Sequence, residues 1–220
     1  MKVVGFVPSK LNSQRLPRKN IRELGGMPLI NYVLRTLSAV SEIDDIVVYA
    51  SDDAVMAAVE DPGSCRYVQR PIELDGDDAT VQDFVGWFLR DVECDVVVLL
   101  HATSPFLSVE TVSECTRAVV SGRHESAFAA EEIRRFAWFG GKPLNYRLDR
   151  PTPRTQDLAP VVVEQSGLYV FTRELFERTG RRIAENPFIK VVDATEGHDI
   201  DTPEEFALAE LIVGARGPSH

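Results

Sequence analysis

PLINYVLRTLSAVSEIDDIVVYA, residues 28–50, joins a helical pattern to a strand pattern. Apolar residues recur through 28–40 with a period near 3.6, and Pro28 stands where a helix can begin. DIVVYA at 45–50 is a short apolar run rich in β-branched residues, which is typical of a buried strand. VVGFV at 3–7 has the same character and is bounded by Pro8. Together these segments predict a strand–helix–strand unit with two parallel strands.

The same alternation continues along the chain. Thr202 as N-cap, Pro203 in the first turn and Glu205 three residues after the cap mark the start of the last helix. DVVVLL at 95–100 is the most hydrophobic strand and is predicted at the centre of the sheet. Further helices are expected at 53–60, 79–92, 109–121, 173–179 and 203–213, and further strands at 66–69, 167–171 and 188–193. The pattern predicts one α/β domain over 1–220, Rossmann-like, with three layers around a mostly parallel sheet.

Residues 126–165 interrupt this alternation. They lack a clean period and are rich in Arg, Pro and aromatic residues, among them Phe136, Trp138 and Phe139. An irregular stretch of this length inside a compact domain usually has a function. We expect it to contain edge strands and to form a contact with a second subunit, because aromatics and Arg are enriched at interfaces. Local packing under the sheet is the other interpretation.

Composition restricts the class of protein. The chain has 220 residues, of which 44% are hydrophobic and 26% charged, so disordered and coiled-coil classes are excluded. Its formal net charge is −10, which makes a nucleic acid polymer a poor partner. The charge is unevenly placed, however: residues 1–22 carry six cations and no acid, a net of +6, whereas the rest carries −16. This split predicts a local site for a smaller polyanion.

The cysteines and the hydropathy profile indicate the compartment. The three cysteines are widely spaced without a CxxC pair, so neither a disulfide framework nor a zinc site is predicted. No apolar run approaches the roughly 18 residues of a membrane span. We therefore expect a cytoplasmic protein without a membrane partner.

The loop after the first strand, residues 7–20, lies where such sheets bind their ligands. It contains neither GxGxxG nor GxxxxGK[ST], which argues against a nicotinamide-binding fold and a P-loop. It offers four long cations and several hydrogen-bonding side chains, and Lys and Arg are natural partners of a triphosphate. The alternative is a solvated surface loop. The relevant side chains are Lys10, Arg15, Arg18, Lys19, Ser9, Asn12, Ser13 and Asn20.

VPSKLNSQRLPRKNIRELGGMPLI, residues 7–30, resembles the first motif of the sugar-acid cytidylyltransferases, which act on acylneuraminate or 3-deoxy-manno-octulosonate. Lys19 and Asn20 match that motif outright, Arg15 fits its octulosonate form, and Lys10 replaces an Arg. Five further motifs follow in the family's order. They are QRPIELDGDDATVQDFV (69–85), VVLLHATSPFLSVETV (97–112), PRTQDL (153–158), EQSGLYVF (164–171) and GHDIDTPEEFALAE (197–210).

The resemblance implies a nucleotidyltransferase fold and a reaction that joins CMP from CTP to an acidic sugar, with pyrophosphate released. It implies catalytic roles for Lys19, Arg15 and Asp201. It also implies a homodimer in which 126–165 forms the dimer contact. Nucleotide-binding residues implied by the motifs are Pro8, Ser9, Lys10, Asn20, Arg70, Asp78, Ala79 and Thr80.

Asp199 and Asp201 are the candidate metal ligands. They are two residues apart on an extended stretch, so both side chains are expected on the same face. Two carboxylates on one face suit Mg²⁺, which also takes phosphate oxygens. The structural alternative is that Asp201 and Thr202 only cap the following helix, and both interpretations can hold together.

The candidate acceptor-binding residues depart from the family pattern. His101 replaces a Gln, Gln165 an Asn and Thr155 an Arg. These departures weaken an assignment to N-acetylneuraminate and leave open another sugar acid or a non-sugar acid such as a phosphonate. His101 can donate to a carboxylate, act as a base, or serve only at a strand end. The full set is His101, Thr103, Ser104, Arg154, Gln156, Gln165 and Tyr169.

Two other functions compete with this one. A uridylyl- or guanylyltransferase of related fold is disfavoured, because its GxGxRxxP-type loop is missing. A nucleotide-binding homologue without catalysis is disfavoured by the retained Lys19, Asp199 and Asp201.

Overall fold

A seven-stranded sheet forms the centre of the molecule in the computed structural model, which describes residues 1–76 and 78–216. The strand order is β11-β7-β10-β6-β1-β4-β5, so β6 is central as predicted. Only β10 runs antiparallel to its neighbours in this sheet; the other pairs are parallel. The strands are β1 (Val3–Ser9), β4 (Asp45–Ala50), β5 (Arg66–Gln69), β6 (Val96–Leu100), β7 (Ser126–Ile133), β10 (Val161–Thr172) and β11 (Phe188–Val191).

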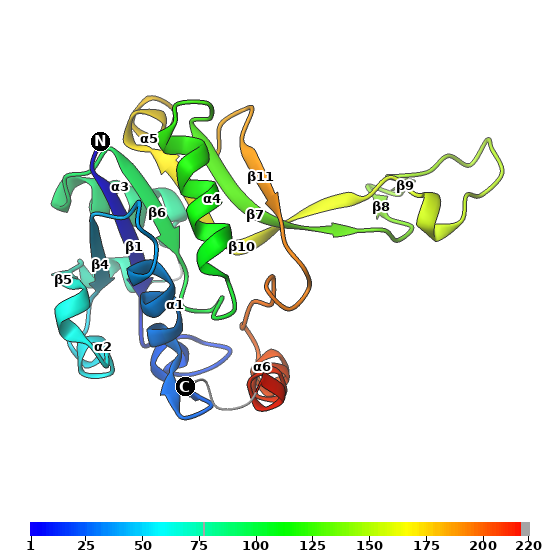
Figure 1. The fold of residues 1–220 in the computed structure, drawn as a ribbon. Coiled ribbons are helices and arrows are strands. Elements are labelled where there is room, and N and C mark those ends of the chain that lie inside the picture. The colour runs from blue at the N-terminus through cyan, green and yellow to red at the C-terminus, as the bar shows by residue number, and fades with distance from the viewer. Residues whose placement is uncertain (77, 217–220) are drawn as a thin grey trace.

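Helices cover both faces of this sheet (Figure 1). On one face α1 (Leu29–Ser38), α2 (Ala54–Ala57) and α4 (Val109–Val120) bury their apolar stripes against the sheet. On the other face lie α3 (Val81–Asp91) and α5 (Arg173–Thr179), with Phe88 stacked on Phe6 of β1. The predicted three-layer α/β arrangement is confirmed.

A smaller apolar cluster fixes the elements beside the first loop. β2 (Glu23–Leu24) and β3 (Met27–Pro28) form a hairpin whose two turn residues, Gly25 and Gly26, both have positive φ, as a type I′ turn requires. Leu24 of this hairpin packs with Phe206 of α6 (Pro203–Arg216). The cluster holds the C-terminal helix against the segment that follows the cationic loop.

The start of α6 agrees with the sequence pattern. Thr202 Oγ1 accepts a hydrogen bond from Glu205 N at 3.3 Å, and Glu205 Oε2 accepts one from Thr202 N at 2.8 Å. This is the reciprocal capping box predicted from the spacing. Elsewhere the short helix expected at 53–60 is limited to α2, and the strand expected at 167–171 begins earlier, at Val161.

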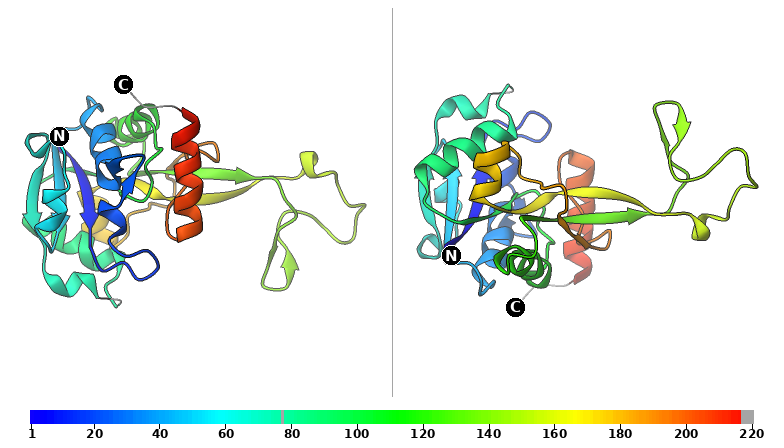
Figure 2. Two further views of the ribbon diagram at one scale, coloured as in Figure 1. Left: turned by 90° about the horizontal axis from the view of Figure 1, so that it is seen from below. Right: turned by 90° about the horizontal axis from the view of Figure 1, so that it is seen from above.

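Residues 126–165 differ from the expected irregular excursion. Residues 126–133 are β7, an interior strand between β10 and β11, and its first five residues are buried. The expectation of edge strands is therefore wrong for this part, because Ala-rich SAFAAEEI is a buried strand without a β-branched run. Residues 134–160, here called the arm, project from the body and carry the small hairpin of β8 (Trp138–Phe139) and β9 (Lys142–Pro143) (Figure 2).

Topology places the loops of interest at one edge. β1, β4, β5 and β6 run in the same direction, so their carboxyl ends meet at one edge of the sheet. The antiparallel β10 passes the same edge with Ser166 and Gly167 beside the end of β6. Within the described part of the chain, no helix is long and apolar enough to cross a bilayer.

Candidate functional site

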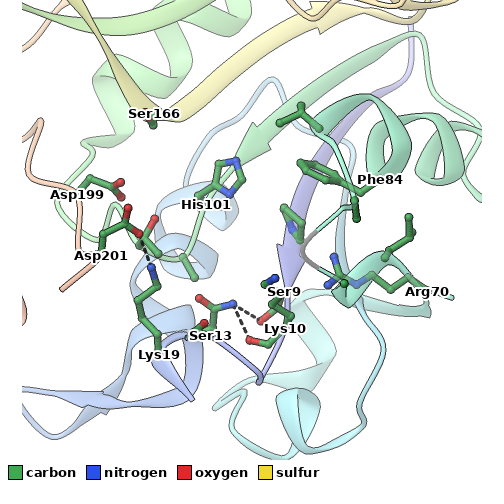
Figure 3. A pocket seen from close by; sticks show the side chains of 18 of the residues that line it. Ser9, Lys10, Ser13, Lys19, Arg70, Phe84, His101, Ser166, Asp199 and Asp201 are labelled. Carbon is green, nitrogen blue, oxygen red and sulfur yellow. Dashed lines mark hydrogen bonds and ion pairs between the residues drawn. The ribbon is translucent and has the colours of Figure 1, made fainter. Parts of the chain in front are cut away.

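A cavity of about 380 Å³ lies at this carboxyl edge. Figure 3 shows Ser9, Lys10 and Lys19, the residues of the loop after β1 that are predicted to bind phosphate, on one side of the cavity, and His101 and Ser166 on the other. Segments from the whole length of the chain meet here. The lining residues are Pro8, Ser9, Lys10, Ser13, Lys19, Asn20, Arg70, Leu74, Gly76, Ala79, Val81, Phe84, His101, Ala102, Thr103, Ser166, Arg182, Asp199 and Asp201.

The loop after β1 is folded back on itself by its own polar groups. Asn20 is buried and donates to Ser9 Oγ at 3.0 Å and to the Lys10 carbonyl at 3.2 Å. Arg18 has a left-handed backbone, with φ of 55°, and its N–H donates to the Leu11 carbonyl at 3.1 Å. A non-glycine residue in this region is strained, and such strain is common at functional sites. The fold-back directs Lys10 and Lys19 into the cavity.

Asp201 receives two cations from that loop. Lys19 Nζ lies 2.6 Å from Asp201 Oδ1, and Arg15 Nη2 lies 2.6 Å from Oδ2. Burial alone would raise the pKa of Asp201, but the hydrogen bond and charge of Lys19 and the charge of Arg15 outweigh it and lower the pKa. The three predicted catalytic residues are therefore in direct contact, although Arg15 stays largely exposed.

Asp199 lies in the opposite electrostatic situation. Burial raises its pKa, the Asp201 charge adds to the rise, and hydrogen bonds from Thr103 and Ser104 only partly offset it. Ser104 Oγ donates to Asp199 Oδ1 at 3.1 Å and accepts from Gln165 Nε2 at 2.9 Å. Two predicted acceptor residues, Ser104 and Gln165, thus form a buried chain behind Asp199 and are absent from the described cavity lining.

His101 lines the cavity where β6 ends, and the residue as a whole is half-buried. Desolvation and the charges of Arg182 and Lys19 lower its pKa to about 4, although Asp201 acts in the opposite direction. The imidazole is therefore neutral near pH 7, with one N–H donor and one acceptor nitrogen. This favours a hydrogen-bonding role over that of a general base, since an efficient base has a pKa near the working pH.

The side of the cavity where nucleotide binding was predicted contains a residue that the motifs did not indicate, Asp75. Its carboxylate forms a buried ion pair with Arg70 and accepts from Ser51 Oγ at 2.6 Å. Its carbonyl accepts from Lys10 Nζ at 3.2 Å and from Asn12 Nδ2 at 3.1 Å. Asp75 thus connects the loop after β1 to the loop after β5. An acid five residues after Arg70 was the available sequence signal, but spacing alone did not show its partners.

Other predicted residues fall outside the cavity lining. Asp78 is an exposed turn residue, and Thr80 accepts from Asp83 N at 3.2 Å as the N-cap of α3, whereas Ala79 does line the cavity. Arg154 and Gln156 lie on the arm, where Arg154 pairs with Asp157. Within one chain the structure does not bring these two arm residues to the cavity lining that it describes.

Tyr169 and Arg182 form a pair at the cavity wall. Tyr169 is buried behind the wall, and its hydroxyl donates to Glu164 Oε2 at 2.7 Å. The Arg182 guanidinium lies over the Tyr169 ring, 3.5 Å from its centroid, and lines the cavity. Sequence reasoning missed Arg182, together with Phe84 and Ser166. Arg182 lies in a segment without helix or strand, beside a second arginine, so no periodicity distinguished it.

The surroundings of Asp199 and Asp201 decide whether these carboxylates suit a metal ion. Among the described residues, no group of three or more His, Cys, Asp or Glu side chains is arranged to hold a metal ion. Asp199 and Asp201 do line the same cavity, and their charges interact. Mg²⁺ in phosphate-binding sites commonly takes one or two carboxylates, with waters and phosphate oxygens completing its shell. The donor set fits a magnesium ion shared with a nucleotide.

Comparison with known sequences places the chain among cytidylyltransferases. Residues 4–137 match the family described as "Cytidylyltransferase". N-acylneuraminate cytidylyltransferase of Oncorhynchus mykiss is 28% identical over 80% of this chain, which spans 42% of that relative's length. CMP-N,N'-diacetyllegionaminic acid synthase of Legionella pneumophila is 27% identical over 97% of both chains. 3-Deoxy-manno-octulosonate cytidylyltransferase of Bdellovibrio bacteriovorus is 23% identical over 99% of this chain and 100% of its own.

Solved structures agree in fold. A CMP:2-keto-3-deoxy-manno-octonic acid synthetase complexed with CTP superposes with a TM-score of 0.76 at 19% identity, covering 98% of this chain and 100% of its own. A 4-diphosphocytidyl-2C-methyl-D-erythritol synthase from Anaerococcus prevotii gives 0.66 at 16% identity, covering 96% and 95%. Both support the nucleotidyltransferase fold.

Proposed function

The chain belongs to the cytidylyltransferase family, and we propose that it transfers CMP from CTP to a small acidic sugar with release of pyrophosphate. The observation that carries this proposal is the Lys19–Asp201 contact, which joins the loop after β1 to the carboxylate pair inside one cavity. Relatives named for acylneuraminate, octulosonate and legionaminic acid support the class of acceptor.

The cationic loop supplies the phosphate side of the reaction. Lys10 and Lys19 line the cavity, and Arg15 contacts Asp201, which lines it as well. Their positive charges would neutralise the triphosphate and stabilise the negative charge that develops on the leaving pyrophosphate. Attack at the α-phosphorus needs little covalent chemistry from the protein, so positioning and charge dominate.

We propose Mg²⁺ as the cofactor, held by Asp199 and Asp201. When bound, the ion would polarise phosphate oxygens and neutralise part of their charge. Lys19 and Arg15, which contact Asp201 directly, would then turn toward the phosphates. The buried chain from Gln165 through Ser104 orients Asp199 for this role.

We also propose that the protein is a cytoplasmic homodimer formed through the arm. Trp138 and Phe139, which form β8 in the arm, are 56% and 80% exposed, and Leu144 and Leu148 nearby are exposed as well. Exposed apolar side chains at this density indicate an interface. In a dimer, Arg154 and Gln156 of the arm would be available to the partner's cavity. The free state of the three cysteines suits a reducing compartment.

The direct test measures pyrophosphate release with CTP, UTP, ATP and GTP in the presence of Mg²⁺ and a panel of acids. The panel contains N-acetylneuraminate, 3-deoxy-manno-octulosonate and, as a non-sugar acid, 2-aminoethylphosphonate. The expected result is release with CTP and an acidic sugar, with the product mass equal to that of the CMP ester. Release with another nucleotide alone, or with none, would reject the proposal.

A further inference from the structure

The segment after α5 brings an additional cation to the cavity. Gly180 ends α5 with a left-handed backbone, φ 66°, and the chain then turns so that Arg182 lines the cavity with His101, Ser166 and Asp199. Figure 3 shows His101 and Ser166 on the side away from Ser9 and Lys10. Arg182 lies over Tyr169 of β10, and its charge acts on His101 at the end of β6, so it belongs to a different wall from the loop assigned to the triphosphate.

The guanidinium of Arg182 is held in place from behind. It lies over the Tyr169 ring, 3.5 Å from the ring centroid, and the Tyr169 hydroxyl donates to Glu164 Oε2 at 2.7 Å, which fixes the ring. Tyr169 itself is 1% exposed within β10. A planar cation stacked on a buried ring presents its remaining N–H groups in a fixed direction.

The charge of Arg182 is not balanced by a salt bridge. Of the other cations that line the cavity, Lys19 and Arg70 are paired with Asp201 and Asp75, and Lys10 Nζ donates to the Asp75 carbonyl. Arg182 forms no salt bridge with any carboxylate of the described residues, and Glu164 acts on it only at longer range. Burial lowers the pKa of Arg182, yet an arginine remains charged in proteins. A desolvated cation without a carboxylate is costly, and a bound anion would offset that cost.

Two neutral donors lie on the same wall. The His101 imidazole is uncharged near pH 7 and offers an N–H, and Ser166 offers a hydroxyl. A guanidinium fork with two neutral donors matches the oxygens of a carboxylate or a phosphonate, because two parallel hydrogen bonds fit its geometry. A neutral sugar hydroxyl would leave the charge uncompensated.

We infer that Arg182 determines the specificity for the acceptor by binding its anionic group, with His101 and Ser166 as neighbouring donors. This inference rests on the proposed function and deepens it, since it assigns the acceptor's anion to one wall and CTP to the other. Anchoring the acceptor here leaves the cavity between Arg182 and the loop after β1 for its attacking oxygen.

Steady-state kinetics with Arg182→Gln, Arg182→Lys and the control Arg181→Gln test the inference. Arg181 is an exposed neighbour of the same chemistry that is absent from the described cavity lining. We expect Arg182→Gln to raise the acceptor KM about 10- to 100-fold, the range for a charged hydrogen-bonded pair. The CTP KM should stay within about threefold, as a single charge on the far wall contributes little to it. The acceptor KM of Arg182→Lys should lie between those of the wild type and Arg182→Gln, because lysine keeps the charge and loses the paired N–H donors of the guanidinium. An unchanged acceptor KM, or a rise in the CTP KM instead, overturns the inference.

A binding experiment keeps the inference separate from the reaction. The His101 imidazole signals of isotope-labelled protein are followed by NMR while acetate or methylphosphonate is added. Both the wild type and Arg181→Gln should respond to one of these anions, and Arg182→Gln should not. The stronger response distinguishes a carboxylate site from a phosphonate site. If neither anion moves the wild-type signals, or if Arg182→Gln responds equally, the inference is wrong even where CMP transfer is observed. Absence of turnover with a preserved response would reject only the proposed reaction.

Discussion

At the scale of the residue, two carboxylates two positions apart are in opposite electrostatic states. Asp201 faces Lys19 and Arg15, whose combined effect lowers its pKa, whereas burial raises the pKa of Asp199. The two acids line the same cavity, but their neighbours differ. Divergent environments for paired acids are typical of catalytic sites.

Replacement of Lys19 by Ala should lower the rate of pyrophosphate release about 100-fold, because one buried cation at the developing charge is lost. Initial rates at saturating CTP and acceptor measure this effect. Arg18→Asn is the matched control: it removes a cation from the same loop while keeping a residue type that tolerates the left-handed backbone at this position. Near-normal activity of Lys19→Ala would contradict the assigned phosphate role.

Asp201→Asn removes the anion but keeps the shape of the side chain. Because the folded-state pKa of Asp201 is lowered, its contribution to stability is complete above the unfolded value of about 3.9 and is lost as the pH falls through the folded value. The variant should be less stable at pH 7 by about 1 kcal/mol or less, since Asp201 is partly exposed. Urea unfolding at pH 7 and at acidic pH measures the difference. If the difference in stability between the wild type and Asp201→Asn grew toward acid pH, the lowered pKa of Asp201 would be refuted.

His101→Gln tests whether this imidazole acts as a base. A neutral histidine with a pKa near 4 serves as a hydrogen-bonding group, and an amide can replace it. We expect His101→Gln to keep activity within about tenfold of the wild type, and His101→Ala to lose more. The acid limb of the pH–rate profile should be the same in the wild type and His101→Gln. A loss of about 100-fold or more in the Gln variant would indicate general-base catalysis instead.

At the scale of the element, the approach of β10 to the end of β6 decides how the carboxylates are held. Gly167 on β10 leaves room for Ser104, whose hydroxyl bridges Gln165 and Asp199. A Cβ at position 167 would lie 2.0 Å from Ser104 Oγ and 2.4 Å from its Cβ. Glycine is required here by close approach of the two segments.

Gly167→Ala should therefore destabilise the protein by about 1–3 kcal/mol through overpacking. Activity should fall as well, because Ser104 would move away from Asp199. Gly86→Ala in α3 is the matched control, since its nearest neighbour would be 3.9 Å away. There the helix should gain about 0.5–1 kcal/mol. Thermal unfolding should show a lower midpoint for Gly167→Ala and a higher midpoint for Gly86→Ala than for the wild type. Equal midpoints would disprove the close approach of β10 to Ser104.

At the scale of the whole molecule, the arm is the feature that one chain does not explain. Residues 134–160 extend from β7 and β10 away from the body (Figure 1), and the aromatic residues of β8 in this arm are exposed. Arg154 and Gln156 lie on this arm and not at the cavity of their own chain. A second copy that covers the arm would account for both observations.

The double variant Trp138→Ser/Phe139→Ser should convert a dimer to a monomer, because it removes the exposed aromatic side chains of β8 in the arm. Sedimentation velocity measures the oligomeric state. Trp87→Ser, which removes an exposed tryptophan from α3, is the control and should leave the state unchanged. A wild-type protein that sediments as a monomer at micromolar concentration would refute the proposed dimer.

The order of strands and helices was predictable because each element follows from a local pattern. The period near 3.6 in residues 28–40 and the apolar run at 95–100 identified α1 and the central β6. β7 was missed because SAFAAEEI has little β-branched character; burial between β10 and β11 makes it a strand. Tertiary context overrode local propensity there.

Motif residues with a local geometric reason were also predictable. Lys19, Asn20, Arg70 and Asp201 line the cavity. Each lies in a loop that the alternation of strands and helices brings to the carboxyl edge of the sheet. Thr80 lies outside it because its hydroxyl caps α3, a competing local use of the same side chain. Tyr169 and Gln165 stand behind the wall and act through Arg182 and Ser104.

The sequence alone determined the alternating elements, the cationic loop within an acidic chain and the six ordered motifs, since all of these are properties of neighbours along the chain. Only the tertiary structure decided which charges meet. The contacts of Lys19 with Asp201, Arg182 with Tyr169 and Gln165 with Ser104 join segments from different parts of the fold. Such contacts depend on the packing of the sheet and its loops in three dimensions, and no periodicity in a linear sequence records them.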